Sequence, residues 1–203
     1  MDKKSLLKSI AESGYNVGFG AKKHFATYDI VDKTPGFIGF ISTTFGIYAL
    51  IYEQLSTKFL SASLVVLGFI GIYISLYDSN KGDYDKAGVA LTQLFNQLRN
   101  LYRNTQSADD SMLPQIEQEL RSIEDQYYEN SKSKQILFSD WYAHYKFFWQ
   151  HQIDWVDEQK QFKLFRDKIP LTLSITVLFI FAVIVCWRLN FLNIICINTP
   201  DKI

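Results

Sequence analysis

The strongest constraint on this chain is the placement of its charged residues, which leaves three long runs without any. No Asp, Glu, Lys or Arg occurs at 34–52, 59–77 or 169–187, and each run is 19 residues long. A bilayer core of about 30 Å is crossed by about 20 helical residues rising about 1.5 Å each. Three buried helices of this kind in a soluble protein would need a larger polar shell than the remaining residues supply. We therefore predict three transmembrane helices.

The overall composition hides this pattern, because 48% hydrophobic residues and a net charge of zero would also suit a soluble domain. Tyr52, Tyr77 and Trp187 close the three runs, as expected for aromatic residues at a membrane surface. Only residues 53–58 separate the first two runs, which is enough for a tight turn between antiparallel helices. The runs 34–52 and 59–77 should therefore form a transmembrane hairpin over 34–77.

This hairpin fixes the expected topology. The polar segments 1–33 and 78–168 must lie on one side of the membrane, and the short tail 188–203 on the other if the run 169–187 spans. Most of the lysines and arginines near the runs lie in the two long segments, so the positive-inside rule makes these cytoplasmic. We expect an all-α, multi-pass protein with a cytoplasmic N-terminal amphipathic segment, a transmembrane hairpin, a cytoplasmic helical section and a third transmembrane helix.

The segment after the second run carries an apolar repeat typical of a coiled coil, with spacings of three and four residues. We predict that the second span continues as one rod over 59–104, that Gly82 is its only weak point, and that the repeat joins copies into a homo-oligomer. A similar repeat follows at 113–127, and 135–168 is helical in composition, so three antiparallel helices are expected in this section. The predicted oligomer seam consists of Tyr84, Ala87, Leu91, Leu94, Leu98 and Leu101.

Few residues suggest chemistry. His144 and His151 are seven residues apart, about 10.5 Å along a helix, and so do not share one metal ion within a chain. We interpret His24, beside Lys22 and Lys23, as a lipid headgroup contact. Gly14, Gly18 and Gly20 lack the strand and Lys-Ser pair of a phosphate loop and favour an interfacial helix or a close helix crossing. We expect no enzymatic activity, no cofactor and no metal.

Two groups of residues remain as candidate sites. Aromatic residues interleaved with lysines at 138–165 suggest either a helix-packing face with a membrane belt or a nucleotide contact, since rings beside cations hold single bases. The candidate nucleotide contacts are Trp141, Tyr145, Lys146 and Trp149. Small residues in the first two runs let helices approach closely in lipid or line a pore. These are Ser42, Gly46, Ser61, Gly68, Gly71 and Ser75.

Three stretches of the chain resemble the SLATT family, whose name denotes two-transmembrane effectors associated with SMODS nucleotidyltransferases and SLOG domains. They are SIAESGYNVGFGAKKHFATYDIVDKTPGFIGFIS, LSTKFLSASLVVLGFIGIYISLYDS and KAGVALTQLFNQLRNLY. The resemblance covers roughly residues 5–105 and includes no catalytic motif. The third run departs from a two-helix description, which leaves open whether the hairpin alone would line a pore.

The resemblance implies a bacterial inner-membrane effector of antiviral defence, as in cyclic-oligonucleotide-based (CBASS) systems. Such an effector would assemble, form a pore or disrupt the bilayer and kill the infected cell when a nucleotidyltransferase makes a cyclic nucleotide. No DNA or RNA partner is expected. The alternative is a membrane-tethered coiled-coil scaffold that recruits a partner protein and conducts nothing.

Overall fold

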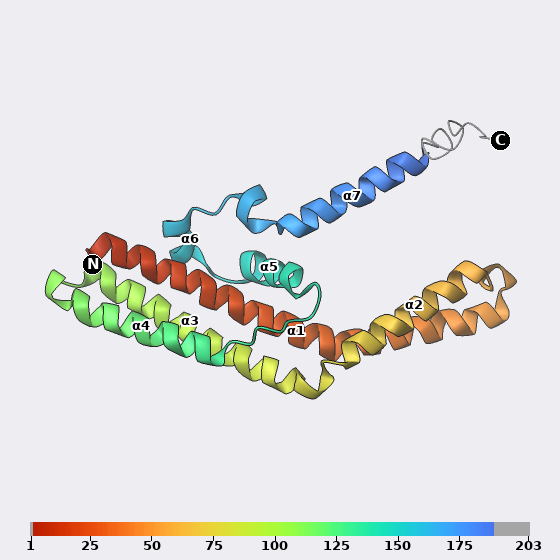
Figure 1. Cartoon of the computed structure of the whole chain (residues 1–203), viewed down its shortest axis with the longest axis horizontal. Helices are drawn as coiled ribbons and strands as arrows, with labels where there is room; N and C mark the ends of the chain where they lie inside the picture. The colour runs from red at the N-terminus through yellow and green to blue at the C-terminus, as the bar shows by residue number, and fades with distance from the viewer. Residues whose placement is uncertain (1, 189–203) are drawn as a thin grey trace, which may run out of the picture. The chain divides into compact units, whose positions relative to one another are not determined.

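The computed structural model describes residues 2–188, and every regular element in this range is a helix (Figure 1). Segments of α1, of the helical stretch 58–107 and of α7 are long and apolar enough to cross a membrane. The predicted all-α membrane protein is therefore confirmed. The chain forms two compact units, Met1–Gln161 and Phe162–Ile203, and each is described by itself.

Helix α1 runs from Lys3 to Ile51 without interruption and joins the predicted cytoplasmic segment to the first span. Its first turn is capped by the Asp2 carboxylate, which accepts a hydrogen bond from the Ser5 amide at 3.3 Å. Pro35 lies inside the helix, where its ring removes one backbone donor and bends the axis. Figure 1 shows this bend between the two halves of α1.

The second half of α1 forms the expected hairpin with α2, which runs from Lys58 to Ser75. A 3₁₀ turn at Glu53–Leu55 makes the connection. The hydroxyl oxygen of Thr57 then caps α2 by accepting a hydrogen bond from the Leu60 amide at 3.2 Å. The two membrane helices are thus joined by a connection as short as the sequence predicted.

The prediction of one rod over 59–104 is wrong. Helix α2 ends at Ser75, a 3₁₀ turn follows at Asp78–Asn80, and α3 runs from Lys81 to Ser107. Both α2 and α3 pack against α1. Because α1 bends at Pro35, the segment that packs along it, from α2 into α3, must change direction too. The interruption therefore lies at residues 76–80, before Gly82, and the continuous helix between the membrane hairpin and the rest of the unit is α1.

The part outside the membrane helices is a helical bundle built around the first half of α1. Helix α3 packs most extensively against it, and α4, from Leu113 to Asn130, packs against both. Side chains at three- and four-residue spacing fill the core: Leu6, Ile10, Val17 and Ala21 on α1, with Leu113, Ile116, Leu120 and Ile123 on α4. The N-terminal segment is therefore the centre of this bundle and not an interfacial helix.

The predicted oligomer seam lies inside this bundle. Leu91 and Leu98 have no exposed surface, and Tyr84, Ala87, Leu94 and Leu101 are also buried. In this conformation α1 and α4 occupy the face of α3 that we had assigned to a second copy. The apolar repeat was recognised correctly, but its partners are helices of the same chain.

The stretch 135–168 is less regular than predicted. Helix α5 runs from Ser139 to Gln150 and α6 from Asp154 to Lys160. Gln161, with φ 51°, ends α6 in the left-handed region. In the second unit a π-helical turn at Leu164–Lys168 precedes α7, which runs from Leu171 to Arg188. Pro170 lies immediately before α7, as expected at a helix start. The predicted tail lies outside the described residues except for Arg188.

Candidate functional site: the membrane hairpin and its junction with the bundle

The small residues of the hairpin do not all face the same surroundings. Ser42, Gly46 and Gly71 are half-buried within the hairpin, whereas Ser61, Gly68 and Ser75 are exposed. The exposed serines satisfy their hydroxyl groups locally: Ser61 donates to the Thr57 carbonyl oxygen at 3.1 Å, and Ser75 donates to that of Ile72 at 2.7 Å. Three of the six predicted positions are therefore half-buried and three are exposed.

The glycines of the hairpin have no packing role within the chain. A Cβ atom added at Gly36, Gly39, Gly46, Gly68 or Gly71 would meet no atom within 4 Å. Glycines of the bundle differ, since a Cβ at Gly18 would lie 2.7 Å from the Phe95 ring and one at Gly88 would lie 2.8 Å from the Phe25 ring. Close packing explains these bundle glycines, but nothing within the hairpin explains those in the membrane helices.

A small apolar cluster connects the hairpin to the bundle. Its buried members come from α1, α2, the α2–α3 link, α3 and the segment before α5: Val31, Ile74, Tyr77, Tyr84 and Ile136. The Tyr84 hydroxyl also donates to the Lys134 carbonyl oxygen at 2.7 Å. This junction holds the α2–α3 link, α3 and the segment before α5 against the ends of both membrane helices.

Ion pairs surround the same junction. Asp29 accepts hydrogen bonds from Lys33, at 2.5 Å, and from Lys146. Burial alone would raise the pKa of Asp29, but the hydrogen bonds from the two lysines lower it below its usual value. On the other side, Lys81 lies 3.3 Å from both Asp32 and Asp78. These pairs fix α3 and α5 to the end of α1 that enters the membrane.

The four predicted nucleotide contacts all lie on α5, where Trp141, Tyr145 and Trp149 follow one another at four-residue spacing. Lys146 is held by Asp29 on α1, and its ammonium lies 4.6 Å from the centre of the Tyr142 ring. Tyr145 and Trp149 are exposed on the surface of α5. Trp141 is half-buried, with its ring 4.7 Å from that of Phe138. The contacts of Lys146 therefore fit a helix-packing face better than a nucleotide pocket.

The three histidines are held by hydrogen bonds and ring contacts within the bundle. His24 is buried, with Nδ1 2.7 Å from the Gly20 carbonyl oxygen and Nε2 accepting the Lys132 amide hydrogen at 2.9 Å. The predicted headgroup contact is therefore wrong. The His144 ring packs on Phe19 and the His151 ring packs on Phe95. Within residues 2–188, no group of three or more His, Cys, Asp and Glu side chains could hold a metal ion.

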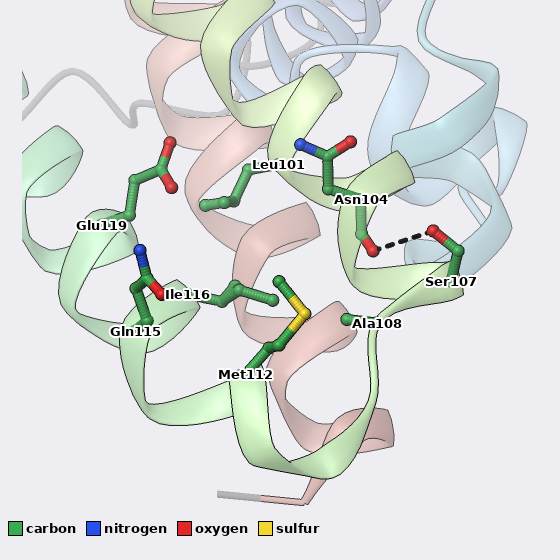
Figure 2. A pocket seen from close by; sticks show the side chains of 8 residues that line it. All are labelled: Leu101, Asn104, Ser107, Ala108, Met112, Gln115, Ile116 and Glu119. Atoms are coloured by element: carbon green, nitrogen blue, oxygen red, sulfur yellow. Dashed lines mark hydrogen bonds between the residues drawn. The ribbon is translucent and has the colours of Figure 1, made fainter.

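Two of the pockets in the bundle matter here, and we predicted neither. One, of about 330 Å³, opens at the α3–α4 turn, with Leu101, Ile116 and Met112 beside the polar Asn104, Gln115 and Glu119 (Figure 2). The other, of about 400 Å³, lies between α3 and the segment containing α6. It is lined by Arg99, Arg103, Gln152, Asp154, Trp155 and Glu158.

The second pocket includes two buried donors without an acceptor. Arg99 Nε and Trp155 Nε1 have no hydrogen-bond partner within the described part of the chain. Buried donors are normally paired with protein or with ordered water. The four-residue spacing of Arg99 and Arg103 on a helix was the sequence signal that could have indicated this pocket.

Residues 1–177 match the family described as SMODS and SLOG-associating 2TM effector domain 6. The chain belongs to this family. The match includes the whole bundle, the hairpin and the junction, and it ends within α7. The membrane hairpin of this effector domain is therefore α1 with α2, while most of α7 lies beyond the match. No curated protein and no solved structure matches the chain.

Proposed function

We propose that the protein is a membrane effector of bacterial antiviral defence that assembles through its hairpin and makes the inner membrane permeable. The observation that carries this proposal is the set of hairpin glycines that have open space beside them. Small residues allow membrane helices of separate subunits to approach closely. The family description supports an effector function. In this proposal the N-terminus is cytoplasmic, and copies of the chain meet through α2 and not through the buried seam of α3.

The activating signal is proposed to be a cyclic nucleotide that reaches the cytoplasmic bundle. The pocket with Arg99 and Arg103 suits such a ligand better than the pocket at the α3–α4 turn, because guanidinium groups bind phosphates in pairs of hydrogen bonds. The pocket lies between α3 and α6, and both helices pack against α1. A ligand that separated α3 from α6 would change how these two helices pack against α1, the continuous helix that enters the membrane.

Leakage of a trapped dye from liposomes tests the permeabilising function. Cyclic oligonucleotides should trigger leakage through the wild-type protein but not through a Gly68→Ile, Gly71→Ile variant, in which branched side chains hold neighbouring helices apart. Val66→Ile is the matched control, because it enlarges an exposed residue on another face of α2 and should retain leakage. If no tested nucleotide causes leakage in any variant, the scaffold alternative is favoured.

Direct binding is tested separately by calorimetry with the same nucleotides. Replacing both Arg99 and Arg103 with alanine should abolish binding, since it removes the cationic side of the pocket. Arg121→Ala is the control, because Arg121 is exposed on α4 and pairs with Glu117. Equal binding by the double variant and the control would place the signal elsewhere or in a partner protein.

A further inference from the structure

The segment between α4 and α5 lies beside the end of the membrane helix α2. Its Leu137 amide donates a hydrogen bond to the Tyr73 hydroxyl at 3.4 Å, and Tyr73 lies in the last turn of α2. The Lys134 ammonium lies 4.9 Å from the centre of the Tyr77 ring, directly after that helix. This segment is therefore fixed beside the end of a membrane helix, although Leu137 is 64 residues further along the chain than Tyr73.

The segment turns two apolar side chains outward at this position. Ile136 is buried in the junction, whereas Leu137 and Phe138 are 61% and 53% exposed. Thr27 donates to the Gln135 side-chain oxygen at 2.5 Å and helps to hold the segment on α1. Phe138 has φ 68°, a left-handed conformation that is unfavourable for a bulky residue. The surrounding contacts therefore hold the apolar side chains of Leu137 and Phe138 in exposed positions, although contact of such side chains with water is unfavourable.

Helix α5 continues this apolar surface. Ser139, Ala143 and Phe147 are buried, while Phe138, Tyr142 and Tyr145 lie on another face and are exposed. Lys146 links this face to the end of α1: it lies over the Tyr142 ring and binds Asp29, which also binds Lys33 just before the first span. The exposed rings at the start of α5 thus lie on the side of the helix nearest the membrane.

We propose that residues 134–145 form a second membrane contact that rests on the cytoplasmic lipid surface. Leu137 and Phe138 enter the boundary between headgroups and acyl chains, and Tyr142 and Tyr145 lie at the headgroups, where amphipathic rings are favoured. Lys134 and the largely exposed Lys33 provide positive charge for lipid phosphates. The occupant is lipid because this surface continues directly from the end of α2, where the bilayer begins.

A fluorophore that responds to polarity tests this contact without relying on leakage. Cys186 and Cys196 are replaced with serine, and a single cysteine at position 138 or 112 is labelled with NBD in nanodiscs containing brominated or ordinary lipid. Met112 is the control because it is 50% exposed at the α3–α4 turn, away from the hairpin (Figure 1). Position 138 should show blue-shifted emission that brominated lipid quenches, and position 112 should show neither.

Two results would overturn the proposal. Emission at position 138 that matches position 112 would mean that the segment faces water. A blue shift without quenching would mean that protein covers it, either α7 or a second copy. Leu137→Cys provides a second labelled site if Phe138→Cys disturbs the turn. Because no pore is needed for the quenching, this proposal and the proposed permeabilising function succeed or fail independently.

Discussion

Gly14 and Gly18 allow aromatic rings from α3, α5 and α6 to reach the backbone of α1. At Gly18, a Cβ would lie 2.7 Å from the Phe95 ring and 2.9 Å from that of Phe147. Gly18→Ala should therefore destabilise the bundle by about 1–3 kcal/mol through overpacking. Hydrogen exchange in the first half of α1 should accelerate by about 5- to 150-fold, at about 1.4 kcal/mol per factor of ten.

The matched control for this substitution is Gly82→Ala on α3. A Cβ at Gly82 meets no atom within 4 Å, so alanine adds only its better helix propensity, worth at most about 1 kcal/mol. Exchange should then stay the same or become slower. Equal acceleration in both variants would show that the rings over Gly18 can move aside and that its lack of a side chain is not required.

His151 gives the bundle a pH dependence. Burial lowers its pKa from 6.5 to about 4, and the charges of Lys22 and Arg99 act in the same direction. The unfolded chain therefore binds a proton at this residue at higher pH than the folded chain does. The stability contribution is fully present above about pH 6.5 and is lost as the pH falls toward about 4.

This titration can be removed while the ring is kept. His151→Phe retains an aromatic ring against Phe95 and Phe147. The thermal unfolding midpoint of the wild type should fall between pH 7 and pH 4.5, and that of the variant should fall less. The pKa of His24 is also lowered by burial, so part of the fall in the unfolding midpoint should remain in the variant. An identical fall in both proteins would assign the acid sensitivity to other groups.

At the scale of elements, α3 differs most from its predicted role. Leu91 and Leu98 are fully buried between α3 and the rest of the bundle. Replacing both with aspartate removes leucine packing worth about 2–5 kcal/mol at each site and places carboxyl groups in an apolar core. We expect this variant to lose the folded bundle even as a monomer, and limited proteolysis of the detergent-solubilised protein should then cleave within α3 and α4.

The control is Gln93→Asp with Asn100→Asp, which keeps the seven-residue spacing and places both charges on exposed positions of α3. This variant should resist proteolysis as the wild type does. A Leu91→Asp, Leu98→Asp variant that remained protected but failed to form oligomers would instead restore the intermolecular seam. The comparison therefore distinguishes a helix that holds one chain together from a helix that joins several.

The elements were predictable to different degrees for physical reasons. The spans followed from charge placement alone, because lipid excludes charged side chains over a fixed thickness. The central role of residues 3–33 was missed because glycine, alanine and His24 occupy core positions of α1, and the apolar cover comes from Phe95, Phe147 and Trp155 elsewhere in the chain. The break after α2 was missed although Asp78, Ser79 and Asn80 are residues that favour turns and helix caps, because only glycine and proline were considered as helix breakers.

At the scale of the whole molecule, the continuous helix α1 is the direct mechanical connection between bundle and membrane. We had expected the second span and α3 to provide it, but residues 76–80 interrupt that path. The junction cluster keeps α2 and α3 beside α1, so the bundle is connected to the hairpin both through α1 and through this cluster. The candidate site is therefore distributed along the protein and includes both the glycine-bearing helices and the residues that hold them.

The number of membrane crossings is the last prediction. The family description names two transmembrane helices and the match ends within α7, yet α7 is long and apolar enough to cross. In a protein without Cys186 and Cys196, single cysteines at positions 54, 112 and 203 should react differently with a membrane-impermeant maleimide added to intact cells. Positions 54 and 203 should be labelled from outside, and position 112 only after permeabilisation. If position 203 behaves like position 112, α7 lies in or on the membrane without crossing it, and the hairpin alone spans the bilayer.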